Sequence, residues 1–131
     1  MTTQTNTPPL VPAHSFQQRC VNWLIECFGI ESTTKKPERI HRFTEEALEL
    51  AQSAGCTKDE VLQLVDYVYS RPKGEFTQEV GGVATTLAVL CNAYGVNLED
   101  AQEAGLVDAW SRLQAIREKR KLKPEIGPLP Q

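Results

Sequence analysis

The chain has 131 residues, of which 40% are hydrophobic, and a formal net charge of −3 at pH 7. This length suits one domain that buries a core of its own. The acidic balance excludes a surface that coats a nucleic acid polymer, because binding to phosphate backbones needs a basic face. No apolar run approaches the roughly 18 residues of a membrane span, and the N-terminus lacks the basic and then apolar order of a signal peptide. We therefore expect a cytoplasmic protein that does not contact membranes.

Proline marks both ends of the chain. Residues 1–13 and 124–131 are Pro-rich with little apolar content. Such segments cannot offset the entropy cost of ordering, so we expect two disordered tails. Residues 14–123 between them are expected to form a single all-α domain.

Amphipathic patterns predict the first two helices. Apolar residues at intervals of three and four predict a helix over 15–28, which Gly29 ends. Pro37 suits the first turn of a second helix, which continues along an apolar stripe to Gly55.

A capping box marks the third helix. Thr57 supplies the hydroxyl at the N-cap position and Glu60 the carboxylate three positions later. Pro72 ends this helix, because the residue before a proline is pushed out of the helical region.

The fourth predicted helix, over about 75–94, is nearly uncharged after Glu79. A helix that is apolar on most faces is usually central in a bundle or buried in an oligomer. This surface is too extensive for one small bundle to cover, so we expect a dimer or tetramer of the chain. Two glycines in mid-helix, Gly81 and Gly82, indicate a close helix crossing or the close approach of a ligand.

A last helix is expected from Asn97, which caps it, to about Lys121, and Gly105 is expected to kink or split it. No strand pattern or hairpin dipeptide occurs in the chain. We therefore predict an all-α bundle of about four to five helices. Their neighbours should be mainly antiparallel, because the connections are short.

The four cysteines are scattered, with no Cys-x-x-Cys pair and no His at zinc-ligand spacing. Each lies beside apolar residues, and a free cysteine behaves as a small buried hydrophobe. We expect all four to be reduced core residues.

Three carboxylates within one helical turn are the most informative feature of the chain. Glu45, Glu46 and Glu49 lie in the second predicted helix beside its apolar stripe. The helical repeat directs all three toward one region, where like charges repel. Oxygen ligands of this kind suit a hard divalent cation such as Mg²⁺.

The fourth predicted helix offers further carboxylates. Glu75 and Glu79 are one turn apart, and a carboxylate beside a long apolar run usually has a partner. Two antiparallel helices that each carry carboxylates would make a metal site between them. The alternative is a solvated acidic face in which Arg42 pairs with Glu46 at a spacing of four.

These carboxylates resemble a family motif. Glu46-Ala-Leu-Glu49 follows Glu45, and Glu79 begins the later stretch Glu-Val-Gly-Gly-Val. The pattern is similar to that of the MazG-like all-α nucleoside triphosphate pyrophosphohydrolases, which have Glu-x-x-Glu on one helix and Glu-x-x-Asp on a later one. The resemblance covers about residues 38–120, and Gly82 stands where the family has its Asp.

The resemblance implies a MazG-like fold and a metal-dependent reaction. A nucleoside triphosphate or related nucleotide would be hydrolysed to the monophosphate and pyrophosphate, with Mg²⁺ as the cofactor and Mn²⁺ as an alternative. The implied metal ligands are Glu46, Glu49 and Glu79. Glu75 or Asp66 would substitute for the absent Asp.

The resemblance also implies roles outside metal binding. Glu45 or Glu46 would orient or deprotonate the attacking water. Three basic residues near the C-terminus, Arg117, Lys119 and Arg120, would hold phosphate oxygens. For each of these three, a solvated helix end is the alternative.

Gly82 supports a second hypothesis about function. Because a metal ligand of the family is missing there, the chain would be a non-catalytic nucleotide-binding or structural helical oligomer that keeps the fold.

Overall fold

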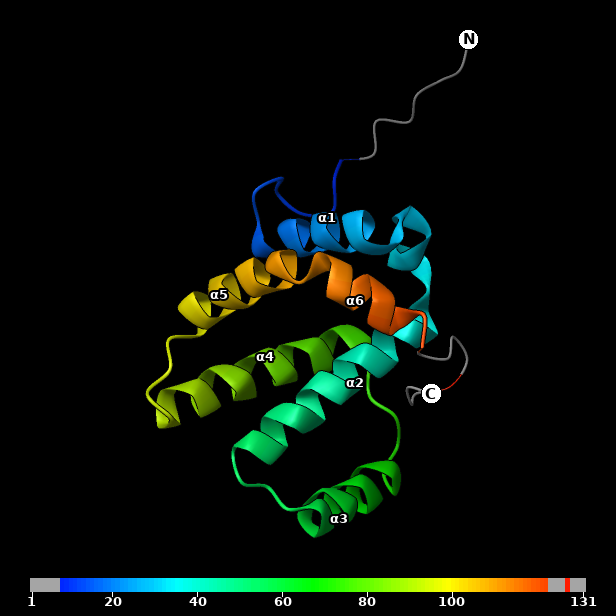
Figure 1. Cartoon of the computed structure of the whole chain (residues 1–131). Coiled ribbons are helices and arrows are strands. Elements are labelled where there is room, and N and C mark those ends of the chain that lie inside the picture. The colour runs from blue at the N-terminus through cyan, green and yellow to red at the C-terminus, as the bar shows by residue number, and fades with distance from the viewer. Residues whose placement is uncertain (1–7, 123–126, 128–131) are drawn as a thin grey trace. The chain divides into compact units, whose positions relative to one another are not determined.

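The computed structural model describes residues 8–122 and 127, and all regular structure in these residues is helical (Figure 1). The elements in chain order are α1 (Phe16–Phe28), the short 3-10 helix η1 (Ile30–Thr34), α2 (Lys36–Ser53), α3 (Lys58–Tyr69), α4 (Phe76–Ala93), α5 (Leu98–Ser111) and α6 (Leu113–Arg120). The predicted all-α class is confirmed. The predicted disorder of the tails falls largely outside the described residues. Among the described helices, none combines the length and apolar character that crossing a membrane requires.

Several helix ends lie where local chemistry specifies them. Ser15 accepts a hydrogen bond from the backbone N–H of Gln18 at 3.2 Å and so caps the start of α1. Gly29 follows the end of α1 at φ +89°, a backbone conformation that strains residues with a Cβ. At α3, Thr57 accepts from the backbone N–H of Glu60 at 3.2 Å and Glu60 accepts from the backbone N–H of Thr57 at 2.9 Å, which confirms the capping box.

The last predicted helix is divided, but not at Gly105. Helix α5 continues through Gly105, where the position of an added Cβ lies in open space. The break is at Arg112, whose backbone N–H is shared between the carbonyls of Asp108 and Ala109. The expected split at Gly105 is therefore wrong, because a helix tolerates one glycine at a cost of about 1 kcal/mol. The break instead lies where α6 begins to pack against α1.

The chain divides into two compact units. One comprises Met1–Lys36 with Glu99–Gln131 and holds α1, η1, α5 and α6, and the other is Pro37–Leu98, with α3, α4 and nearly all of α2. The single domain expected over 14–123 stays a prediction.

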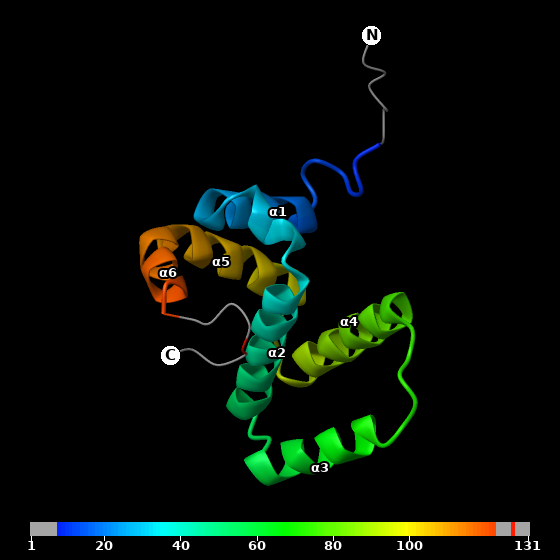
Figure 2. The same ribbon diagram turned by 90° about the vertical axis from the view of Figure 1, so that its right-hand side faces the viewer.

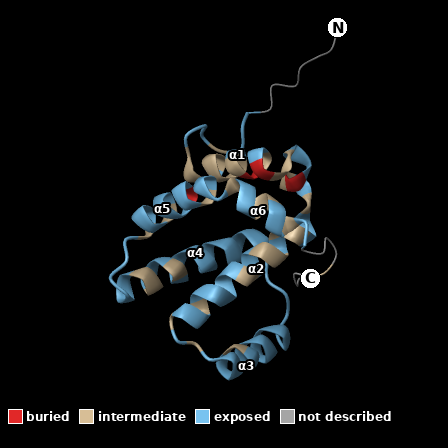
Figure 3. Ribbon diagram, viewed as in Figure 1, coloured by how far each residue is buried: buried red, intermediate tan, exposed pale blue. Residues whose placement is uncertain are grey.

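The first unit holds the buried residues of the described chain (Figure 3). Leu24 and Cys27 of α1 are buried, as is Leu106 of α5. Ser32 in η1 is also buried, and its hydroxyl donates to the carbonyl of Phe28 at 3.2 Å. Since burying an aliphatic side chain is worth about 1.5–3 kcal/mol, this small core is a main contribution to the packing of α1 in the unit.

All four cysteines are free thiols, and of these only Cys27 is buried, while Cys20, Cys56 and Cys91 keep partial exposure. Desolvation by burial is the largest cause of a raised pKa at both the Cys20 and the Cys27 thiol. These two thiols therefore stay protonated near neutral pH, which makes them weak nucleophiles.

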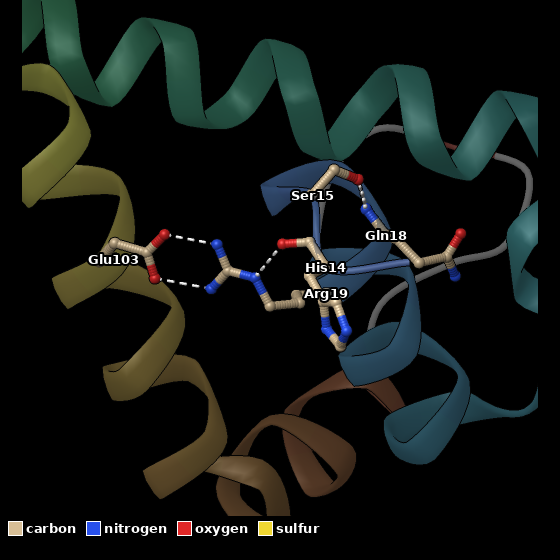
Figure 4. A network of polar contacts seen from close by, with 5 residues as sticks. All are labelled: His14, Ser15, Gln18, Arg19 and Glu103. Atoms are coloured by element: carbon tan, nitrogen blue, oxygen red, sulfur yellow. Dashed lines mark hydrogen bonds and ion pairs between the residues drawn. The ribbon is translucent and has the colours of Figure 1, made fainter. Parts of the chain in front are cut away.

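An arginine and a glutamate join α1 to α5 at the surface of the first unit (Figure 4). Arg19 donates from Nη1 and Nη2 to the two carboxylate oxygens of Glu103, at 2.7 and 2.5 Å, and from Nε to the carbonyl of His14 at 3.1 Å. The hydrogen bonds from Arg19 lower the pKa of the Glu103 carboxyl. Because both side chains stay exposed, the pair orients the two helices more than it stabilises them.

A second arginine joins α6 to the C-terminal end of α1. Arg117 donates from Nε to the carbonyl of Cys27 at 2.9 Å and from Nη2 to the carbonyl of Glu26. The last carbonyls of a helix have no partner within the helix, so this guanidinium satisfies two of them. Arg120 adds a cation–π contact, with its guanidinium carbon 4.5 Å from the centre of the Phe28 ring.

The second unit has no buried residue between positions 37 and 98. Large apolar side chains are exposed on all three of its helices: Ile40, Phe43, Leu48 and Leu50 on α2, Leu62, Leu64, Val65 and Val68 on α3, and Phe76, Val80, Val83 and Val89 on α4. The position expected for α4 at the centre of a bundle is therefore wrong for a single chain. No described atom crosses closely at Gly81 or Gly82, because a Cβ added there meets nothing within 4 Å.

Helices α2 and α4 run in the same general direction (Figures 1 and 2). The hydroxyl of Tyr94 donates to the carbonyl of Ala54 at 2.8 Å, which joins the C-terminal ends of the two helices. The antiparallel arrangement that we predicted for this pair is wrong. Helix α3 lies between them in the chain, and reversing direction at each connection makes the first and third helices parallel.

The contacts of Arg117 predict a loss of stability on truncation. We expect Arg117→Ala to lower the free energy of unfolding by about 1–3 kcal/mol, because two carbonyls of α1 lose their charged donor. Urea unfolding followed by circular dichroism measures this. The control is Lys119→Ala, which removes an exposed charge from the same helix and should change stability by less than about 0.5 kcal/mol. Equal stability of the two variants would contradict a structural role for Arg117.

Candidate metal site

Glu45, Glu46 and Glu49 form an acidic turn in the C-terminal half of α2. Glu45 is half-buried, whereas Glu46 and Glu49 are exposed. Glu45 and Glu49, four residues apart, both line a hollow of about 390 Å³ on the second unit. The structure therefore brings these two carboxylates to one place, as the helical repeat predicts, while Glu46 does not line the hollow.

The hollow has mixed walls contributed by α2, α3 and the turn between them. Its full lining is Glu45, Leu48, Glu49, Gln52, Cys56, Lys58 and Val61. Lys58 is the first residue of α3, so a cation and the positive end of a helix dipole lie at this hollow with the two carboxylates. Donors for anionic groups and ligands for a cation thus line one hollow.

Two residues of this hollow were missed by the sequence reasoning. Gln52 follows Glu45 by seven and Glu49 by three, so the helical repeat could have placed it on the same face. Lys58 carries no such signal, because its position depends on the turn at Gly55, which has φ +92°.

Glu75 has a structural role at the start of α4. As the N-cap residue, it accepts hydrogen bonds from the backbone N–H of Thr77 at 3.0 Å and of Gln78 at 2.8 Å. These two bonds lower the pKa of the Glu75 carboxyl. Both carboxylate oxygens are engaged in capping, which makes Glu75 a poor substitute for a metal ligand.

Glu79 and Asp66 lie on other helices of the same unit. The carboxylate of Glu79, in the first turn of α4, lies so close to Gly74 that a Cβ there would clash with it. Asp66 is exposed on α3. Neither residue lines the hollow that holds Glu45 and Glu49.

The parallel direction of α2 and α4 explains why Glu79 is not near Glu49. Tyr94 and Ala54 lie together at the C-terminal ends of the two helices. Glu79 is 15 residues before Tyr94, whereas Glu49 is only five residues before Ala54. At about 1.5 Å of rise per residue, their positions differ by about 15 Å along the helices, whereas Mg²⁺ ligands lie about 2 Å from the metal. Among the described residues, no group of three or more His, Cys, Asp or Glu side chains is arranged to hold a metal ion.

The predicted phosphate-binding residues belong to α6. Arg117 and Arg120 contact α1, as described above, and Lys119 is exposed. These contacts account for the two arginines structurally, and phosphate binding by the three residues stays a prediction.

Comparison with protein-family models, with curated proteins and with solved structures finds no match to this chain. The resemblance to MazG-like enzymes therefore rests on the motif residues alone, and membership of that family stays a prediction.

The capping role of Glu75 predicts a pH-dependent stability. Because the pKa of Glu75 is lowered in the folded state, its carboxylate stabilises the fold above the ordinary pKa near 4.5, and this contribution is lost as the pH falls through the lowered pKa. We expect Glu75→Gln to lower the urea midpoint at pH 7 and to match the unmodified chain at pH 2. The control Asp66→Asn, on an exposed side chain, should leave the midpoint unchanged. A midpoint for Glu75→Gln that equals that of the unmodified chain at pH 7 would contradict the capping role.

Proposed function

We propose that this chain is a Mg²⁺-dependent nucleoside triphosphate pyrophosphohydrolase whose site is the acidic turn of α2. The observation that carries the proposal is that Glu45 and Glu49 line one hollow, which also contains Lys58. The motif resemblance supplies the reaction: water attacks a phosphorus of the triphosphate, and the bond to the pyrophosphate leaving group breaks.

The donor set fits a magnesium ion. Mg²⁺ is usually bound through one or two carboxylates together with waters and substrate phosphates, so Glu49, which lines the hollow, would suffice as a protein ligand without Glu79. A bound Mg²⁺ supplies neutralisation of charge on the phosphate oxygens. The same cation would relieve the repulsion of Glu49 with Glu45 and with Glu46, which at spacings of four and three is about 0.2–0.5 kcal/mol for each of these two pairs.

The remaining groups of the hollow have separate tasks in this proposal. Glu45, the half-buried carboxylate, accepts the proton of the attacking water as a general base. Lys58 attracts the anionic triphosphate through charge.

Pyrophosphate release tests the proposed reaction. We expect the full chain with Mg²⁺ to release pyrophosphate and a monophosphate from at least one member of a panel of nucleoside triphosphates. Glu45→Gln should lower the rate by about 10²-fold or more, because a carboxamide cannot take the proton. The matched control is Glu118→Gln, an exposed glutamate of α6, which should leave the rate unchanged.

Two results would reject the enzyme. One is the absence of release from every nucleotide in the presence of Mg²⁺ and of Mn²⁺. The other is release that is equal in the unmodified chain and in both Glu45→Gln and Glu49→Gln.

A second candidate function, a non-catalytic helical oligomer, is favoured by the surface of the second unit. Helix α4 exposes Phe76, Val80 and Val83, which share one face at spacings of four and three, and Glu79 is its one charged residue in 18. Contiguous apolar surface of this kind is typical of an interface. We propose that a second copy of the chain covers it, because an apolar helix with one charge matches the same helix of another copy.

Light scattering tests the self-association. We expect the mass of a dimer or tetramer for the unmodified chain. Val83→Glu should shift the mass toward a monomer, because burying an unpaired carboxylate in an apolar interface is costly. Gln63→Glu adds the same charge at an exposed polar position of α3 and should keep the oligomer. A monomeric mass for the unmodified chain would contradict the interface.

A further inference from the structure

The apolar residues of α2 and α4 follow a seven-residue repeat. On α2 they alternate at spacings of three and four and form a line that we call the α2 seam: Ile40, Phe43, Ala47, Leu50 and Ala54. The same alternation on α4 defines the α4 seam: Phe76, Val80, Val83, Leu87, Leu90 and Tyr94. Apolar residues with this repeat are typical of helices that pack lengthwise, each inserting side chains between those of the other.

Neither seam is covered within the described part of the chain. Extensive packing between described helices involves α1 with η1 and α1 with α6, and neither α2 nor α4 takes part in it. The seams approach each other at their last positions, where the hydroxyl of Tyr94 donates to the carbonyl of Ala54. Before that point, Ile40, Phe43 and Leu50 on α2 and Phe76 on α4 remain exposed.

We propose that a second copy of the chain covers both seams, with the α2 seam of each copy packed against the α4 seam of the other. This inference rests on the self-association proposed above and identifies which helices meet. A two-fold interface makes each contact twice, and both helices belong to one compact unit. A single dimer therefore gives both seams a partner.

The sizes of the seam residues favour this pairing over the pairing of identical helices. The α2 seam contains two alanines, Ala47 and Ala54, whereas every residue of the α4 seam is larger. Well-packed cores alternate large and small side chains across facing positions. Side chains of the α4 seam can thus fill the space that the alanines leave, which a second α2 seam would fill less well.

The exposed area on the seams is large enough for a stable dimer. Phe43, Phe76 and Tyr94 are 56%, 79% and 58% exposed. Because an aromatic side chain offers about 150–250 Å², these three expose about 300–500 Å² in each copy. A specific interface needs at least about 500 Å² per partner. Further exposed area comes from aliphatic residues of the seams: Ile40, Leu50, Val80 and Val83.

The hollow that holds the acidic turn lies on the other side of α2. Its lining residues on this helix are Glu45, Leu48, Glu49 and Gln52. Each residue of a helix is rotated by about 100° from the one before, which places these four on the face opposite the α2 seam. Dimerisation through the seams therefore leaves the hollow accessible, and the dimer and the proposed enzyme are tested separately.

Analytical ultracentrifugation of matched variants tests the role of the α2 seam. We expect Phe43→Glu to raise the dissociation constant of the dimer at least about tenfold, because an unpaired carboxylate is buried in each of the two contacts. The control Leu48→Glu places the same charge at an exposed apolar position of the same helix, outside the seam. It should associate as the unmodified chain does.

Mixing two variants tests which helices meet. In a dimer of Phe43→Glu with Val83→Glu, both carboxylates fall in one contact between α2 and α4, and the other contact keeps its original residues. We expect the mixture to dimerise more strongly than either variant alone, which also shows that both variant chains fold. If α2 packed against α2 and α4 against α4, each contact of the mixed dimer would still contain a carboxylate, and mixing would restore nothing.

The outcomes separate this pairing from self-association in general. If Phe43→Glu keeps the oligomer while Val83→Glu loses it, association through α4 stands and the role of the α2 seam is overturned. If both variants are monomers and mixing leaves the mass unchanged, the pairing of α2 with α4 is overturned. A monomeric unmodified chain would overturn both the self-association and the pairing, whereas pyrophosphate release decides the enzyme independently.

Discussion

The backbone hydrogen bonding of α2 is the constraint on which the candidate site depends. Each residue of the helix is advanced and rotated by a constant amount, so the glutamates of the acidic turn keep their spacing without help from tertiary packing. The acidic turn can therefore present Glu45 and Glu49 to one hollow although the second unit has no buried residue. Side chains on one helix need few other contacts to keep their spacing from one another.

The two compact units differ in how their side chains are paired and buried. In the first, two arginines join its helices: Arg117 satisfies carbonyls at the end of α1, and Arg19 pairs with Glu103. In the second, apolar side chains on all three helices remain exposed. Burying one such side chain is worth about 1.5–3 kcal/mol, so a second copy that covers α4 would stabilise this unit substantially. Self-association and catalysis are compatible, because the hollow between α2 and α3 and the apolar run of α4 involve different residues.

The candidate site also needs less from α4 than the motif implies. Glu75 caps its helix, Glu79 lies against Gly74, and Gly82 has open space around it. Magnesium is commonly held by one or two carboxylates with phosphates and waters, so in the proposed enzyme the acidic turn and a bound triphosphate would together supply the ligands. Under this proposal, the absent Asp at Gly82 would remove one ligand from a site that the substrate would help to complete.

Local chemistry alone determined the helices and the acidic turn. The capping box at Thr57, the glycine after α1 and the three-and-four spacing of apolar residues all act within a few positions of the chain, and each is present in the structure. Tertiary structure decided the rest. It set the direction of α4 relative to α2 through Tyr94, placed Lys58 beside the glutamates, and gave Arg117 its partners on α1. The reason is that these features depend on which segments meet after the chain turns, and residue spacing within one helix carries no record of that.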